Sequence, residues 1–399
     1  MRIVSLLPSA TEIVYALGLG DDLVGVTFEC DEPASARREK TVVVGGRDTK
    51  GMTPGEIDQY VRSQLAAGED LYTLHAQALA GLDPQLILTQ DLCRVCAIPS
   101  GQVDDALGYL GCRADVLSLD PHSLDDVLAS VLLVGERTRT GDVAQNLVGA
   151  LRARLERVAS AVAGRERPRV AVVEWVDPPF TAGHWVPDLI RAAGGEPVGA
   201  NPGARSVQTS WSEIRSACPD VLIVAPCGYH LDGAAEQASG ILAELPPDVQ
   251  VWAVDADGIV VRPGPRLVDG VEAIAGALHP GAMESLGSPG QQSIRLMTPG
   301  WTRPRSAARL AARHPARDQL VDPGHHDSAD DRPDDPAGTE FDAVARDQAE
   351  DQPADEGSDQ PDHDCRRPVD RALLPAAEDQ LRGGAGEHAQ QDDGDDEHS

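Results

Sequence analysis

The sequence predicts an α/β fold with two Rossmann-like lobes joined by one long helix and followed by a disordered acidic tail. Short apolar runs alternate with helical patterns on both sides of one unbroken amphipathic stretch. After residue 280 this alternation stops and acidic residues dominate. We therefore expect a first lobe over residues 1–137, a connecting helix over 138–164, a second lobe over 165–280 and a tail over 281–399.

Composition and charge limit the partners that this chain can have. Its 399 residues are 41% hydrophobic, which is enough to fill the cores of two lobes. The formal net charge of −31 argues against nucleic acids and anionic membrane surfaces, because both are polyanions. No stretch approaches the roughly 20 apolar residues of a transmembrane helix. We expect a soluble protein that works as a monomer.

The first residues do not read as a secretory signal. Pro8 and Glu12 interrupt the apolar run, and no convincing cleavage site follows. We therefore expect the chain as written in the cytoplasm, and in the periplasm or another extracytoplasmic compartment if the start is misplaced. The seven cysteines of a chain without an export signal are expected to be reduced thiols.

The first lobe alternates strands and helices. Ser9 and Glu12 form a capping-box pattern that predicts a helix ending near Leu17. Thr53 and Pro54 open a second, amphipathic helix. Its predicted apolar face contains Ile57, Val61 and Leu65. The predicted strands of this lobe are residues 2–6, 23–27, 86–89 and 114–119.

The connecting stretch repeats apolar residues every three or four positions. They are Val143, Leu147, Leu151, Leu155, Val158 and Val162. A helix of roughly 26 residues spans about 39 Å at the helical rise. Because that length crosses a domain, we expect this helix to join the lobes stiffly.

The second lobe is organised around residues 174–195, where aromatic residues, prolines and glycines crowd together. A buried strand is predicted just before, at 170–173, and ligands of open α/β sheets bind at the carboxyl ends of such strands. The stretch is therefore predicted to be a rigid binding loop, with a tight turn at Gly183, that presents Trp175, Phe180, His184 and Trp185. The alternative is that Trp175 and Trp185 are core residues. Further strands are predicted at 221–225, 251–254 and 259–261.

The tail contains 27 acidic and 12 basic residues. Its aspartate-rich runs cannot bury enough apolar surface to offset the entropy of ordering the chain. We expect it to be disordered, either as an acidic interaction segment or as a dispensable extension.

Five segments share their pattern and order with a known family. They are RIVSLLPSATEIVYALGL at 2–19, VGVTFECDEP at 24–33, LDPQLILTQDLCRVCAIP at 82–99, DPPFTAGHWVPDLIRAAGG at 177–195 and RPGPRLVDGVEAIA at 262–275. Together they resemble the cobalamin-binding branch of the helical-backbone (class III) periplasmic binding proteins, which capture cobalamin, haem or ferric siderophores for ABC importers. The resemblance covers residues 1 to about 280 and supports the two-lobe fold.

The resemblance implies a solute-binding protein that captures cobalamin or a related corrinoid between its lobes, needs no cofactor and catalyses no reaction. Rigid aromatic rings suit a large flat macrocycle, because they bury much area at low entropic cost. Arg262 would meet a polar group of the ligand or, as the alternative, form a surface ion pair. The implied ligand contacts are Pro8, Ser9, Glu29, Gln90, Trp175, Phe180, His184, Trp185, Tyr229 and Arg262.

Related binding proteins present one exposed glutamate per lobe to the permease of an ABC importer. The resemblance gives this role to Glu213 in the second lobe. The matching position of the first lobe is the uncharged Gln77, and Glu56 is the candidate substitute. The expected docking pair for a permease partner is therefore Glu213 and Glu56.

Two alternative functions remain open. Cys93 and Cys96 form a CxxC motif and Cys227 begins a CGYH segment, so a zinc or iron site or a redox thiol pair is the rival to corrinoid binding. Packing is the simpler role for each thiol, since cysteine often acts as a small buried hydrophobe. Haem or ferric-siderophore binding is the second alternative. An enzyme is not expected, because the sequence has no GxSxG, P-loop or HExxH motif.

Overall fold

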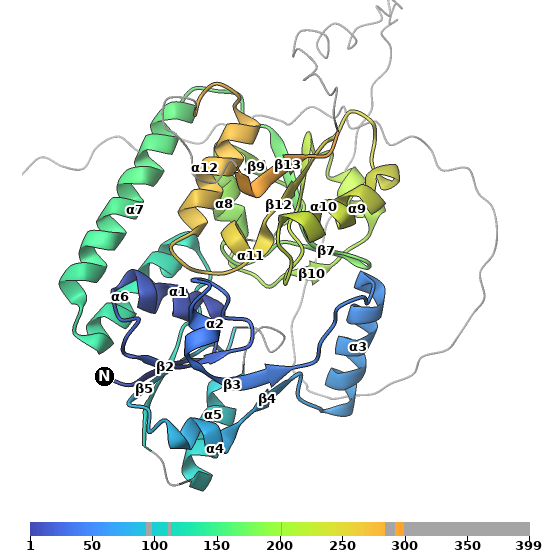
Figure 1. Cartoon of the computed structure of the whole chain (residues 1–399). Coiled ribbons are helices and arrows are strands. Elements are labelled where there is room, and N and C mark those ends of the chain that lie inside the picture. The colour runs from blue at the N-terminus through green and yellow to red at the C-terminus, as the bar shows by residue number, and fades with distance from the viewer. Residues whose placement is uncertain (93–97, 111–112, 201, 284–291, 299–399) are drawn as a thin grey trace, which may run out of the picture. The chain divides into compact units, whose positions relative to one another are not determined.

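The first lobe is built on a six-stranded sheet. The computed structural model describes residues 1–92, 98–110, 113–200, 202–283 and 292–298. The strand order is β4-β3-β2-β1-β5-β6, with β4 antiparallel to β3 and all other neighbours parallel (Figure 1). The strands are β1 (Ile3–Ser5), β2 (Leu23–Thr27), β3 (Thr41–Gly46), β4 (Tyr72–Leu74), β5 (Leu86–Thr89) and β6 (Asp115–Ser118).

Both faces of this sheet are covered, because successive side chains of a strand point to opposite faces. Ile3 and Leu88 belong to the core under α1, whereas Val4 and Ile87 belong to a second core with Val103 of α5. The helices of this lobe are α1 (Pro8–Ala16), α2 (Ala36–Glu39), α3 (Pro54–Ala67), α4 (Ala76–Gly81) and α5 (Ser100–Leu110).

The second lobe has a seven-stranded mixed sheet in the order β10-β8-β7-β11-β12-β13, with β9 also paired to β7. β7, β11 and β12 are parallel, and β8, β10 and β13 run antiparallel to their neighbours. The strands are β7 (Arg169–Val176), β8 (Pro179–Thr181), β9 (Glu196–Pro197), β10 (Val207–Gln208), β11 (Val221–Val224), β12 (Gln250–Val254) and β13 (Ile294–Leu296).

Two apolar cores also cover this second sheet. Val172 and Ile223 pack on one face with α8 and α12, and Val173 and Leu222 pack on the other with α9 and α10. The helices are α8 (Val186–Ala192), α9 (Trp211–Ser216), α10 (Leu231–Gly240), the 3₁₀ turn η1 (Leu242–Glu244), α11 (Ala256–Ile259) and α12 (Leu267–Leu278).

An antiparallel pair of helices, α6 (Leu124–Thr138) and α7 (Gly141–Val162), crosses between the two lobes (Figure 1). α7 lies within the predicted 138–164 stretch, and its buried residues pass from the first-lobe core at Val148 to the second-lobe core at Val158. α6 was not predicted as a crossing element, yet Leu124 lies in the second-lobe core and Val131 in the first. The lobes are therefore joined by two packed helices, which makes the connection stiffer.

Two details of the predicted helix faces are wrong. Val143 of α7 is 45% exposed, and the buried position in that turn is Ala144. α3 has no buried residue at all, and Leu65 on its predicted apolar face is 45% exposed. α3 is therefore a surface helix that does not pack into a core of the first lobe. No helix in the described ranges has both the length and the apolar character needed to cross a membrane.

The predicted capping box at Ser9 is not formed. Pro8 occupies the first turn of α1, so the helix begins two residues earlier than this box predicts, with Leu7 as the N-cap and no side-chain cap. Glu12 instead accepts two hydrogen bonds from Arg266 of the second lobe. The Glu12 carboxylate, which was predicted to cap its own helix, thus makes a long-range contact with the second lobe.

The predicted strand at 259–261 is also wrong. The Asp255 side chain accepts a hydrogen bond from the backbone N–H of Gly258 at 2.8 Å and caps the short helix α11. Val260 and Val261 follow this helix as buried or partly buried residues outside the sheet. A run of β-branched residues was read as a strand where the preceding aspartate starts a helical turn.

The tail predicted to be disordered from residue 281 contributes an edge strand. β13 pairs with β12, and Asp255 N–H donates to Ser293 O while Met297 N–H donates to Val251 O. Met297 packs on the second-lobe core. The folded part of the chain therefore extends at least to residue 298, and residues 299–399 lie outside the described residues.

Candidate ligand-binding site

Three aromatic rings gather at the carboxyl ends of β7 and β11. Trp175 and Phe180 are directly paired across the β7–β8 hairpin, so their side chains share one face of the sheet. The ring of Tyr229, in the loop after β11, lies 5.9 Å from the ring of Trp175. All three side chains are partly exposed. We call Trp175, Phe180 and Tyr229 the aromatic wall.

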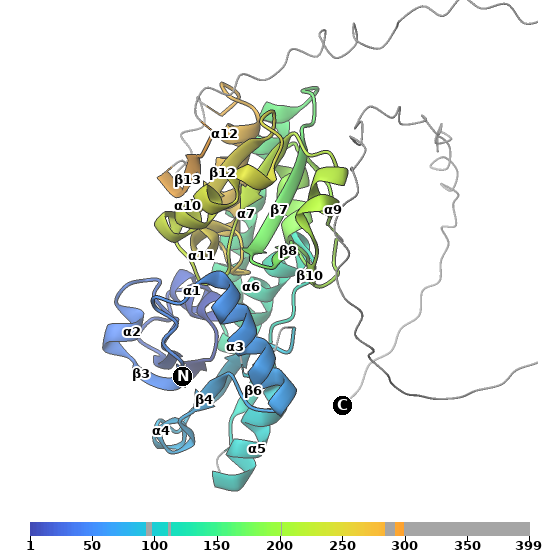
Figure 2. The same ribbon diagram turned by 90° about the vertical axis from the view of Figure 1, so that its right-hand side faces the viewer.

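The aromatic wall contacts the first lobe through α3. The indole Nε1 of Trp175 donates to the carbonyl of Pro54 at 3.2 Å and to that of Asp177 at 3.1 Å. Arg62 of α3 donates to Gln208 of β10 at 2.7 Å. Figure 2 shows α3 next to this part of the second lobe. A ligand on the wall would therefore lie near α3.

His184 and Trp185 belong to a different group of rings. Trp185 is 6% exposed, lies in the second-lobe core and donates its Nε1–H to Val260 O at 2.9 Å. Trp185 therefore has the burial expected of a core tryptophan, which was the alternative role for this residue. His184 lies 6.2 Å from His122, and burial together with His122 and Arg205 lowers its pKa. The predicted single binding loop is thus a hairpin followed by a buried turn.

Gly183 is required in this turn by close backbone contact. A Cβ at this position would lie 2.3 Å from Ala204 O and 2.6 Å from Ser206 N. His184 N–H donates to Ala204 O at 2.6 Å, which holds the two segments together. The predicted tight turn is present, but the positive φ in it belongs to His184, at 49°.

A cluster of charged side chains lies beside the aromatic wall. Arg262 donates to Asp31 of the first lobe at 2.5 Å and to Asp257 at 2.8 Å. His230, next to Tyr229, contacts Asp31 at 3.2 Å and Asp255 at 2.9 Å. Asp31 therefore links the first lobe to two cationic groups of the second. Arg262 forms ion pairs, as the alternative for this residue predicted. The pairs are not on the surface, however, because only 11% of the Arg262 side chain is exposed.

These contacts, together with burial, shift the pKa values of several side chains in the cluster. Hydrogen bonds to Asp255 and Asp31 raise the pKa of His230 to about 10. Burial alone would raise the pKa of Asp31, but the hydrogen bonds from His230 and Arg262 hold it well below its usual range. Burial, with Asp257 nearby, raises the pKa of Glu29 to about 7. At neutral pH His230 is therefore charged, and Glu29 is partly protonated.

The contributions of Glu29 and His230 to the stability of the protein are expected to fall as pH rises from about 4.5 to about 10. The folded-state pKa of Glu29 is raised from 4.5, so its contribution is present below pH 4.5 and is lost by about pH 7. That of His230 is raised from 6.5, so its contribution is present below pH 6.5 and is lost towards pH 10. Thermal midpoints across this range should show both losses.

Two substitutions separate these contributions. Glu29→Gln should remove the lower part of the decline, and His230→Gln the upper part. A His230→Gln protein with the same decline above pH 7 would show that His230 does not titrate as described.

The remaining predicted contacts are mostly buried. Ser9 and Gln90 are 3% and 6% exposed, and Pro8 is partly exposed at the start of α1. Glu29 is partly buried and accepts a hydrogen bond from Tyr72. Sequence reasoning missed Asp31, Asp255 and Asp257, although Asp31 stands two residues after Glu29 in the ECDEP segment.

Glu56 and Glu213 occupy equivalent positions in the two lobes. Each is the third residue of a helix and closes a capping box, with Thr53 in α3 and with Ser210 in α9. Both side chains are exposed. Hydrogen bonds from Thr53 lower the pKa of Glu56, and hydrogen bonds from Thr209 and Ser210 lower the pKa of Glu213. The caps fix two exposed carboxylates in place.

The predicted thiol site lies largely outside the described residues. Cys93 and Cys96 lie outside the described residues, and Cys227 is exposed. No group of three or more His, Cys, Asp or Glu side chains in the described ranges could hold a metal ion. Cys30 is buried, with its Sγ 3.0 Å from Thr11 Oγ1. Cys218 is disulfide-bonded, which contradicts the expectation of reduced thiols throughout.

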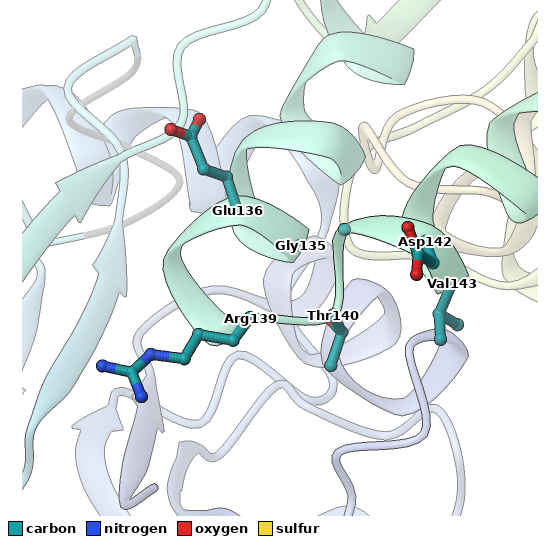
Figure 3. Close-up of a pocket in the computed structure, with 7 residues that line it drawn as sticks. Gly135, Glu136, Arg139, Thr140, Asp142 and Val143 are labelled. Atoms are coloured by element: carbon teal, nitrogen blue, oxygen red, sulfur yellow. The ribbon is translucent and has the colours of Figure 1, made fainter. Parts of the chain in front are cut away.

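A shallow hollow of about 440 Å³ lies at the turn between α6 and α7, away from all the predicted contacts. Its lining includes Glu136, Arg139 and Asp142. Figure 3 shows that Glu136 and Arg139 point in different directions. These charged groups do not converge on a common point.

Known proteins resemble this chain over its two lobes. The sequence profile of the periplasmic binding protein family matches residues 3–245. The vitamin B12-binding protein of Vibrio cholerae is 26% identical over 278 residues, covering 68% of this chain and 87% of that protein. The cobalamin-binding protein of Halobacterium salinarum is 26% identical over 290 residues, covering 70% and 69%.

The solved structures agree on the fold. The periplasmic heme-binding protein RhuT from Roseiflexus sp. RS-1, in apo form, superposes with a TM-score of 0.53 at 22% identity, covering 70% of this chain and 98% of that one. The family consists of substrate-binding proteins of ABC transport and not of enzymes. The family profile covers more than half of the chain, so this protein belongs to the periplasmic binding protein family and is a solute-binding protein with two α/β lobes.

Proposed function

We propose that this protein binds cobalamin or a related corrinoid on the aromatic wall and delivers it to an ABC importer. The observation that carries the proposal is the ring contact between Trp175 and Tyr229 at the carboxyl ends of two parallel strands. Rings in this arrangement offer a flat macrocycle a large apolar surface. The names of the Vibrio and Halobacterium relatives support a corrinoid as the ligand.

We propose a smaller set of ligand contacts than the sequence implied. Trp175, Phe180 and Tyr229 form the wall, with Pro8 and Glu29 as candidates on the first lobe. Trp185, Ser9 and Gln90 are buried in the protein. We therefore assign them to packing and assign Arg262 to ion pairs with other residues of the chain.

A titration with hydroxocobalamin tests this function. The full chain should show saturable one-to-one binding. The binding is monitored by the quenching of tryptophan fluorescence and by the cobalt absorption bands. Haemin, titrated in the same way, distinguishes the second alternative. Binding of haemin without binding of hydroxocobalamin would overturn the corrinoid assignment and favour haem.

We also propose that Glu56 and Glu213 dock on the permease and that the protein acts outside the cytoplasm. The family supports this location over the cytoplasm. Glutamine at both positions keeps the caps and removes the charges. An importer whose ATP hydrolysis responds equally to this double variant would exclude the docking role.

A further inference from the structure

The segment Arg262-Pro263-Gly264-Pro265-Arg266, between α11 and α12, makes close contacts with the first lobe. Arg266 forms a two-point interaction with Glu12 of α1, with Nε to Oε2 at 2.9 Å and Nη2 to Oε1 at 2.6 Å. The Glu12 side chain is only 6% exposed. A paired guanidinium and carboxylate in this geometry is strong and directional.

The other arginine of the segment reaches the first lobe at a second point. Nη1 of Arg262 contacts Asp31 at 2.5 Å, and Nη2 of the same side chain contacts Asp257 at 2.8 Å. The two arginines are four positions apart and take carboxylates from two separate elements of the first lobe, α1 and the loop after β2. The segment is therefore held at both of its ends.

Packing between these two points is equally close. A Cβ on Gly264 would lie 3.2 Å from Glu12 Oε2, so glycine lets the segment approach α1. Val268, in the first turn of α12, is 1% exposed and belongs to the first-lobe core together with Leu7 and Ala10. The start of a second-lobe helix is thus buried in the other lobe.

The contacts at α3 are of a different kind. α3 has no buried residue, and the Arg62 side chain that reaches Gln208 is 52% exposed. Exposed polar contacts of this kind contribute little to stability. The side of the molecule at α3 is therefore more easily opened than the side at α1.

We propose that residues 262–268, with Glu12 and Asp31, form an interlobe clamp that keeps the α1 side closed whether or not ligand is bound, so that ligand enters on the α3 side. Glu12, Asp31, Arg262 and Arg266 are positioning residues in this proposal. The clamp itself does not depend on the identity of the ligand, and only its effect on affinity rests on the proposed function.

Hydrogen exchange on the ligand-free full chain tests the clamp. Glu12→Gln should raise exchange by at least about tenfold both in α1 and in residues 266–270 of the other lobe, because the amide loses the charge of Glu12 and one of the two oxygens that accept hydrogen bonds from Arg266. The second variant, Arg266→Lys, keeps the charge and loses the two-point geometry, so it should give a smaller change in the same two segments. The Arg266→Lys variant tests the clamp by itself if the Glu12→Gln protein does not fold.

A matched control is the exposed pair of Arg137 and Asp115, where Asp115→Asn should leave exchange in the other lobe unchanged. Changes confined to α1 in both clamp variants would overturn the proposal. Loss of protection at α3 before α1 in the wild-type chain would support it, and the reverse order would overturn it.

The affinity effect is measured separately, with hydroxocobalamin as the probe. Loosening the clamp should weaken binding by roughly tenfold, because the lobes must then be ordered when the ligand binds. If wild-type protein does not bind hydroxocobalamin, the corrinoid proposal fails and the exchange result still decides the clamp. Unchanged affinity, with exchange raised in both lobes, would overturn the claim that the clamp organises the site.

Discussion

Replacing Trp175 by alanine is expected to weaken hydroxocobalamin binding by about 100-fold. The substitution removes the largest ring of the aromatic wall. Truncating a central aromatic side chain of a binding surface typically lowers the binding free energy by about 2 kcal/mol or more. It also removes the indole donor that reaches Pro54 at the start of α3. The measurement is the dissociation constant from the cobalt absorption bands, since these do not depend on the tryptophan that is lost.

Trp175→Phe separates the two roles of this side chain. Phenylalanine keeps an aromatic face and loses the N–H group, so it should retain most of the affinity if stacking dominates. An equal loss in both variants would point to the contact with α3 instead. Trp211 of α9, which packs on the other face of the second sheet, provides the control, and Trp211→Phe should leave binding unchanged. A folded Trp175→Ala protein within threefold of wild type would contradict the aromatic wall.

Periodicity and apolar runs were enough to predict most of the strands and the helix α7. Residues such as Val170 to Val173 are buried on both faces of a mixed sheet that is covered on both sides, and that environment produces an uninterrupted apolar run in the sequence. The prediction failed at residues 259–261, where a similar run follows the capping residue Asp255. There a local hydrogen bond outweighs β propensity, and propensity alone cannot reveal it.

The candidate site could be predicted only in part, because its partners are far apart in the chain. The clustering of aromatic residues identified Trp175 and Phe180, and the hairpin that pairs them is local. Arg262 and Asp31 are 231 positions apart. Nothing in the sequence near Arg262 shows whether its partner is a ligand or a carboxylate of the other lobe. Trp185 shares the motif of Trp175 but lies in the core, so the motif alone did not separate the two roles that the sequence left open for these tryptophans.

Gly183→Ala is expected to lower the free energy of unfolding by about 3 kcal/mol. The added methyl group would meet backbone atoms of residues 204–206, which cannot move aside as a flexible side chain could. For two lobes of this size the thermal midpoint should fall by roughly 5–10 °C. Differential scanning calorimetry of the full chain measures this shift directly.

The same substitution should also weaken ligand binding. Ser206 donates a hydrogen bond to Glu174, the residue before Trp175, so displacing residues 204–206 disturbs the strand that carries the aromatic wall. Gly149 is the matched control, because it is exposed in the middle of α7 and a Cβ there meets nothing within 4 Å. Gly149→Ala should stabilise the protein by about 0.5–1 kcal/mol, since alanine is the better helix former. Equal and small effects at both glycines would show that the turn at Gly183 is loose, and the wall would then need another support.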